Sequence, residues 1–190
     1  MSAVLLAIGF KMFEIIILAI ALSMDAFAVS IGLGVKAKKD IKTLAIKAGI
    51  YFGVFQALMP LVGYLGGVGL KDYIGGYDTI IAFVLLLIIG LKMIYEAFEE
   101  NIEDEIQMIS NKILLTLAIA TSIDAMAAGF TLHLFSLNPF VSITLIGIIT
   151  FLFSILGVYI GSKGGEKYEQ KAEVLGGVVL ILIGLKILIF

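Results

Sequence analysis

Residues 13–35 read FEIIILAIALSMDAFAVSIGLGV, a strongly apolar stretch with one aspartate near its centre. An α-helix needs about 20 apolar residues to cross a bilayer, so this stretch predicts a membrane span. The composition of the 190-residue chain agrees, because 61% of its residues are hydrophobic and its mean hydropathy is +1.15. A globular fold in water would have too little polar surface with this composition.

Five further stretches have similar length and hydropathy, and short polar connections separate them. The sequence therefore predicts an all-α membrane protein with six transmembrane helices. The apolar run at residues 3–10 lacks a basic region before it and a clear cleavage site after it, so we interpret it as an extension of the first span or an interfacial segment. The predicted spans are 13–35, 45–70, 74–95, 113–135, 140–161 and 172–190.

All 13 basic residues are lysines, and their distribution predicts the orientation of the spans. If the first, third and fifth connections share one side, that side carries ten lysines and the other side three. Because lysine-rich connections stay in the cytoplasm, both termini are predicted to lie on the outer side of the cell membrane. The acidic run at residues 99–111 does not change this, since acids contribute little to the rule. The ten lysines are Lys36, Lys38, Lys39, Lys42, Lys47, Lys92, Lys112, Lys163, Lys167 and Lys171.

The two halves of the chain resemble each other. SMDA at residues 23–26 aligns with SIDA at 122–125, and IGLK at 89–92 aligns with IGLK at 183–186. Each half holds three spans, an odd number, so the second copy must be inverted. We therefore predict two inverted three-helix repeats, a transporter architecture that binds ions near the membrane midplane. The predicted parts are 1–98, the acidic cytoplasmic connection 99–111, and 112–190.

Asp25 and Asp124 are equivalent in these repeats, and each lies near the middle of its span. A carboxylate at that depth costs about 2.5–3.5 kcal/mol on insertion scales and usually faces the bundle interior. Small residues at helical spacing beside each aspartate would let other helices approach closely. Two carboxylates match a divalent ion in charge, and oxygen ligands suit hard cations. We predict one shared metal site; the alternative is a protonated aspartate that only bonds a neighbouring helix.

Other polar residues are candidate members of an ion path. Gln56 shares a helix face with Pro60 and several glycines, which also fits simple close packing of helices. Met24 and Met126 flank the aspartates, and packing is favoured over thioether ligation. The hydroxyl groups that could complete an ion shell belong to Ser23, Ser30, Thr121 and Ser122.

Three charged residues lie toward the ends of spans. Lys92 and Glu96 are four residues apart and could pair at the membrane edge, although simple snorkelling of Lys92 is the favoured interpretation. Glu173 lies at the start of the last predicted span, where it could cap the helix or gate ion entry.

MDAFAVSIGLG at residues 24–34, ATSIDAMAAG at 120–129 and KAEVLGGVVLILIGLKIL at 171–188 together resemble the MntP-type manganese efflux pumps of prokaryotes. The resemblance covers nearly the whole chain. It implies six spans, two repeats and export of Mn(II) from the cytoplasm, with the family's intramembrane acids at Asp25 and Asp124.

The same resemblance implies roles for four further positions. The family's Lys/Arg and Glu of the third span fall on Lys92 and Glu96, and its KAE acid falls on Glu173. The family pattern often has an acid where this chain has Gln56, so one ligand charge is missing here.

The sequence favours a secondary transporter that needs no cofactor, since it contains no P-loop or ATPase aspartyl motif. Exchange of the ion for protons is a hypothesis, because two close carboxylates titrate as a coupled pair. An intramembrane aspartyl protease is an alternative, but neither aspartate follows the GxG of the usual GxGD signature. An envelope or sporulation protein without transport activity is another. The expected partners are the manganese ion and the lipid bilayer, with no nucleic acid.

Overall fold

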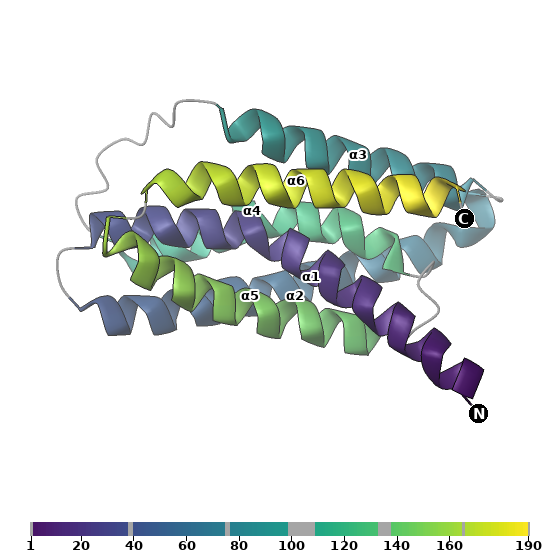
Figure 1. Ribbon diagram of the computed structural model, residues 1–190, viewed down its shortest axis with the longest axis horizontal. Coiled ribbons are helices and arrows are strands. Elements are labelled where there is room, and N and C mark those ends of the chain that lie inside the picture. Colours follow the sequence, from purple (N-terminus) through teal and green to yellow (C-terminus); the bar gives the residue numbers. More distant parts are fainter. Residues whose placement is uncertain are drawn as a thin grey trace.

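The described residues of the computed structural model form six α-helices that run back and forth along one bundle (Figure 1). The helices are α1 (Ser2–Lys36), α2 (Ile41–Ile74), α3 (Asp78–Glu96), α4 (Asn111–Phe130), α5 (Pro139–Gly161) and α6 (Glu166–Ile189). The structure describes residues 2–37, 40–74, 77–98, 109–132, 138–164 and 166–189. Within these ranges, side chains are not described at 2–8, 10, 70–74, 78, 96 and 166–170.

Five of the described helices are long and apolar enough to cross a membrane. The exception is α3, whose apolar part covers only Thr79–Tyr95. The predicted third span began too early, because α2 continues to Ile74 and α3 starts only at Asp78. The all-α prediction is confirmed for the described residues, whereas the count of six spans stays a prediction. The five qualifying segments are Lys11–Lys36, Ile41–Gly69, Asn111–Gly129, Pro139–Gly161 and Lys171–Ile189.

Successive helices run in opposite directions, so α1, α3 and α5 point one way and α2, α4 and α6 the other (Figure 1). Both termini lie at the same end of the bundle, and the helix ends that border the connections after α1, α3 and α5 lie toward the opposite end. Lys36, Lys112 and Lys163, which border these connections, therefore gather at one end. The lysine asymmetry predicted from the sequence is thus an asymmetry between the two ends of the bundle.

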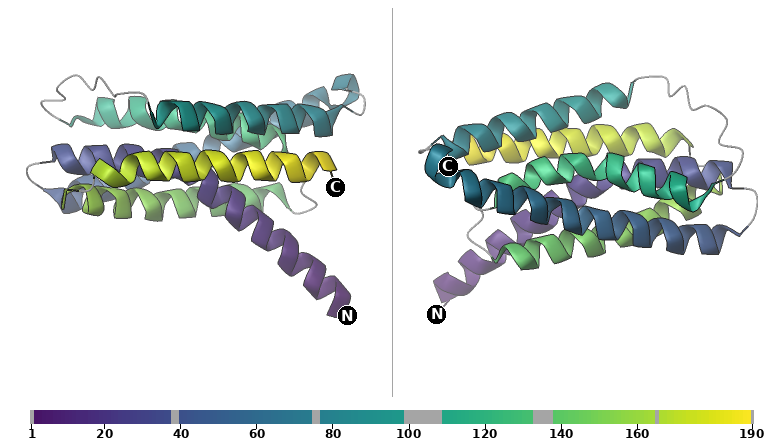
Figure 2. Two further views of the ribbon diagram at one scale, coloured as in Figure 1. Left: turned by 45° about the horizontal axis from the view of Figure 1, so that its top comes forward. Right: turned by 180° about the vertical axis from the view of Figure 1, so that it is seen from behind.

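The N-terminal part of α1 projects away from the other helices (Figure 2). The helix is continuous from Ser2 to Lys36 and so includes the apolar run at residues 3–10. Only the later part, from Lys11 onward, is the membrane-length segment. The run thus continues the first helix, and both interpretations, an extension of the span and an interfacial segment, stay predictions.

The contact between α1 and α5 depends on glycines of α5. A Cβ atom at Gly157 would meet the carbonyl oxygen of Phe27 at 2.7 Å, and one at Gly161 would overlap the carbonyl oxygen of Ile31. Only hydrogen at these positions lets the two backbones approach so closely. The glycine face of α5 is therefore a close-packing face.

The contact between α2 and α4 has the same construction. A Cβ atom at Gly63 would overlap the carbonyl oxygen of Met126, and one at Gly67 would lie 3.0 Å from the carbonyl oxygen of Phe130. The glycine face predicted for the second span is thus also confirmed as a packing face. It holds α4, and with it Asp124, in a fixed register against α2.

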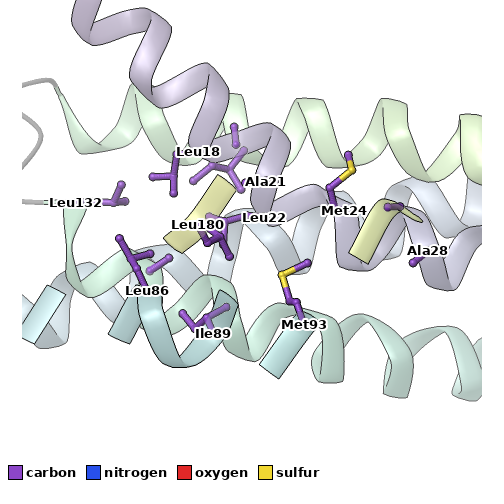
Figure 3. Packing of buried hydrophobic residues seen from close by; sticks show 14 of the residues in the cluster. Leu18, Ala21, Leu22, Met24, Ala28, Leu86, Ile89, Met93, Leu132 and Leu180 are labelled. Carbon is purple, nitrogen blue, oxygen red and sulfur yellow. The ribbon is translucent and has the colours of Figure 1, made fainter. Parts of the chain in front are cut away.

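A hydrophobic cluster fills the space between α1, α3, α4, α5 and α6 (Figure 3). Met24 of α1 and Met93 of α3 belong to it and are 6% and 2% exposed. Both pack at Gly176 of α6, where a Cβ atom would meet each of them within 2.8 Å. Met24 therefore packs as expected, whereas Met126 is more than a third exposed. Other members of the cluster are Leu18, Leu22, Leu86, Ile89 and Leu180.

The outward faces of the helices carry large apolar side chains. On α2, exposed residues recur at intervals of three or four, which places them on one face of the helix. A face of this kind would be a large exposed apolar patch in water, but it is suited to contact with lipid. These residues are Ile50, Val54, Leu58, Val62 and Leu65.

Candidate ion site

Asp124 lies in the central part of α4 and is 8% exposed. Its carboxylate accepts hydrogen bonds from the Lys92 ammonium of α3 at both oxygens, with Nζ–Oδ1 and Nζ–Oδ2 distances of 3.3 and 3.1 Å. The pair joins α3 and α4, the helices that precede and follow the connection 99–111 in the chain. The interior-facing carboxylate predicted at this position is thus present, and a cationic group already contacts it.

Lys92 was expected to snorkel to the membrane edge, and the structure corrects this. Its side chain is 44% exposed, but its ammonium group is directed to the buried Asp124. Lys92 lies one turn before the C-terminal end of α3. This end stops short of the end of the bundle that α1 and α5 reach (Figure 1), so a residue near it can still contact the interior. The Glu96 side chain lies outside the described residues, so a pair between Lys92 and Glu96 stays a prediction.

Asp25 lies in the inner part of α1 and is half-buried. Ala21 and Ala28, which share its face, are at most 1% exposed. The predicted small-residue seam is therefore buried on this helix. No group of three or more His, Cys, Asp or Glu side chains in the described part of the chain could hold a metal ion. A site at Asp25 and Asp124 would consequently need oxygens of other kinds as further ligands.

The four predicted hydroxyl ligands are buried, and each donates its proton to a carbonyl of its own helix. Ser23 and Ser30 donate to Ile20 and Ala26 at 2.8 and 2.6 Å. These bonds use the donor of each hydroxyl but leave lone pairs on its oxygen. The hydroxyls can therefore still accept a hydrogen bond or coordinate a cation. Thr121 and Ser122 likewise donate to the carbonyls of Ala118 and Ile119, at 3.4 and 2.9 Å.

A family model described as "Putative manganese efflux pump" matches residues 39–188, more than three quarters of the chain. A protein of that description from Aliarcobacter butzleri is 70% identical over 179 residues, covering 94% of this chain and all of the relative. The chain belongs to the MntP family. Relatives with the same description from Saccharophagus degradans and Methanosphaera stadtmanae are 55% and 47% identical, covering 93% and 94% of this chain and 98% and 99% of their own lengths. No solved structure matches the chain.

Gln56 is the position where the resemblance implied an acid, and the structure shows what its amide does. The side chain is 1% exposed, and its Nε2 donates to the carbonyl oxygen of Leu22 on α1 at 2.7 Å. Within the described residues, its Oε1 has no hydrogen-bond partner. The hydroxyls of Thr150 and Ser154 on α5 are also fully buried and unpartnered among these residues. Buried oxygens of this kind normally bind water, another polar group or an ion.

Glu173 is 8% exposed and lies inside α6, not at its start. The predicted capping role is wrong, because α6 begins at Glu166, two turns earlier. Lys186, which aligns with Lys92 in the IGLK motif, forms an ion pair with Glu14 of α1. This MntP-family chain thus carries charged groups at several depths in its helices.

Sequence reasoning missed the contact between Lys92 and Asp124. The two residues are 32 positions apart and lie on different helices. A signal was available, because a lysine inside an apolar helix normally has a counter-charge or a carbonyl partner. Asp124 is the acid in the middle of the next predicted span.

Proposed function

We propose that this chain exports manganese(II) from the cytoplasm as a secondary transporter, and that Asp25 and Asp124 form one ion site near the membrane midplane. The observation that carries the proposal is the Asp124 carboxylate, buried in the middle of a membrane-length helix with a cation at both oxygens. A charged acid at that depth is costly and is typical of an ion pathway. The names of its relatives, which describe them as manganese efflux pumps, support manganese as the ion.

The two aspartates belong to inverted repeats, residues 1–98 and 112–190. The packing of α5 on α1 through Gly157 and Phe27 has a counterpart in the packing of α2 on α4 through Gly63 and Met126. Gly157 lies 94 residues after Gly63, and Met126 lies 99 residues after Phe27, which are the offsets of the sequence repeat. The opposite directions of α1 and α4 support the inversion. A pseudo-two-fold axis between the repeats would bring equivalent residues together near the midplane.

The ion shell would combine the two carboxylates with neutral oxygens. Hydroxyl oxygens of Ser23, Ser30, Thr121 and Ser122 are candidates, together with the unpartnered amide oxygen of Gln56. Manganese(II) accepts oxygen ligands of all these types. Glu96, at the end of α3, and Glu173, two turns inside α6, would attract the ion toward the path. Return of the carrier with protons in place of the ion is part of the same hypothesis, because paired carboxylates share their titration.

The direct test is manganese flux through purified protein in liposomes that contain a manganese-sensitive dye. We expect dye quenching above that of protein-free liposomes. Quenching should be faster when the lumen is acidic, because protons then flow out as manganese flows in. Absence of flux both with and without the proton gradient would contradict the transporter proposal. Flux without any effect of the proton gradient would remove the proton hypothesis and leave manganese transport in place.

Both termini are proposed to lie outside the cell, with the lysine-rich end of the bundle in the cytoplasm. Since the chain has no cysteine, a single introduced cysteine reports its own side. Lys163→Cys lies at the lysine-rich end, and Tyr77→Cys, at a position that is 65% exposed, lies at the other end. We expect a membrane-impermeant maleimide to label Tyr77→Cys in intact cells and Lys163→Cys only after lysis. The reverse pattern would contradict this orientation.

A further inference from the structure

The ion pair between Lys92 and Asp124 is unequal in its surroundings. The Asp124 side chain is 11% exposed, whereas that of Lys92 is 44% exposed. The acid is thus fixed in the bundle, while the lysine reaches it from an open side. Lys92 lies one turn before the C-terminal end of α3, and its flexible stem lets the ammonium withdraw toward that end.

The ammonium group of Lys92 contacts the same carboxylate oxygens of Asp124 that a metal ion would bind. Its nitrogen is 3.3 and 3.1 Å from the two oxygens of Asp124, so both oxygens already have a cationic partner. A hard divalent ion binds such oxygens at about 2.0–2.6 Å. An ion at that distance and the ammonium would be like charges in contact, competing for the same lone pairs. The two cations therefore exclude each other at Asp124.

A carrier that has released its ion must return with uncompensated carboxylates in the membrane unless a proton or another cation replaces the ion at each of them. Such a charge is costly in the apolar interior. At Asp124, Lys92 supplies a replacement that is part of the chain and cannot diffuse away, which leaves Asp25 as the carboxylate for a proton. The pair seen here is the arrangement that the empty carrier needs.

Building on the function proposed above, we propose that Lys92 is a tethered counter-cation, which occupies Asp124 when no manganese is bound and must leave for the ion to bind. Lys92 thereby weakens manganese binding and permits return of the empty carrier. This is a positioning role in the transport cycle and not a role in coordinating the ion. A lysine that only held α3 against α4 would have neither effect.

The first test is equilibrium binding of manganese(II) to purified protein, followed by the EPR signal of the free ion. We expect Lys92→Gln to bind the ion about tenfold more tightly than the native chain, because the competing cation is gone. Lys92→Arg keeps the cation and can bind both oxygens in parallel, so its affinity should fall below the native value. Lys47→Gln is the matched control, since Lys47 bonds Asn111 at the lysine-rich end and should leave the affinity unchanged.

Unchanged or weaker binding in folded Lys92→Gln would overturn the proposal. Loss of a partner from a buried ion pair can prevent folding. If Lys92→Gln cannot be purified, Lys92→Arg decides, and an affinity equal to the native value would overturn the proposal. Asp124→Asn separates this inference from the proposed site. If it binds manganese normally, the site at Asp124 is wrong; if it loses binding while Lys92→Gln shows no gain, only the role of Lys92 is wrong.

The second test compares net transport with exchange in liposomes. Exchange of radioactive for unlabelled manganese does not require return of an empty carrier, whereas net transport does. We expect Lys92→Gln to retain exchange and to lose most net transport, while Lys47→Gln retains both. Equal loss of exchange and net transport in Lys92→Gln would indicate a purely structural ion pair and overturn the proposal.

Discussion

Replacing either aspartate by asparagine is expected to abolish manganese export while the protein still inserts in the membrane. Asp25→Asn and Asp124→Asn keep the size and hydrogen bonding of the side chain. Each of them removes one of the two carboxylate charges of the site. We expect the efflux rate to fall by more than about 100-fold in each, since changing even the outer-shell partners of metal sites costs about 10–100-fold. Efflux from manganese-loaded cells at matched protein level measures the effect.

The double variant tests whether the two aspartates act as one unit. Residues of one site are non-additive, so the double variant should be hardly worse than either single variant. Thr144→Val, at an exposed position of α5, is a suitable control for changes in polarity within a span. Near-normal efflux in either single variant would assign that aspartate to a structural hydrogen bond.

The second large effect is expected at Gly63, where α2 meets α4. In Gly63→Ala, the new methyl group would overlap the carbonyl oxygen of Met126, a backbone atom that cannot rotate away. Overpacking usually costs about 1–3 kcal/mol, and contact with backbone places this variant at or above the upper end. We expect a lower yield of folded protein and loss of transport, because α4 carries Asp124.

Gly66→Ala provides the matched control for this prediction. It makes the same substitution on the same helix, but a Cβ atom at Gly66 has no atom within 4 Å to meet. Thermal unfolding in detergent should therefore separate the two variants, with Gly66→Ala close to the native chain. Equal melting temperatures for both variants would contradict the close packing of α2 on α4.

The positions of the helices could largely be predicted because many apolar runs are bounded by charged residues, and some begin at a clear helix start signal. The predicted span 140–161 nearly coincides with α5, where Asn138 caps the helix and Pro139 occupies its first position. The predicted span 113–135 is less accurate at its end, since α4 stops at Phe130. The residues that follow are still partly apolar, and hydropathy alone does not mark where backbone hydrogen bonding stops.

The candidate site could be predicted only in part. An aspartate inside an apolar span is conspicuous in a sequence, so Asp25 and Asp124 were found without a structure. The partner of Asp124 was not found, because the contact depends on how deeply α3 lies relative to α4. Helix depth is set by packing, such as that of Gly90 on the Gly177 carbonyl of α6, and sequence periodicity does not report it.

The measurement that most directly tests the shared ion site is the number of manganese(II) ions bound per purified chain. EPR titration should give one ion for the native chain and none, at the same concentrations, for Asp25→Asn and for Asp124→Asn. Two independent ions per native chain, or one ion still bound with native affinity by either variant, would contradict a single site formed by both aspartates.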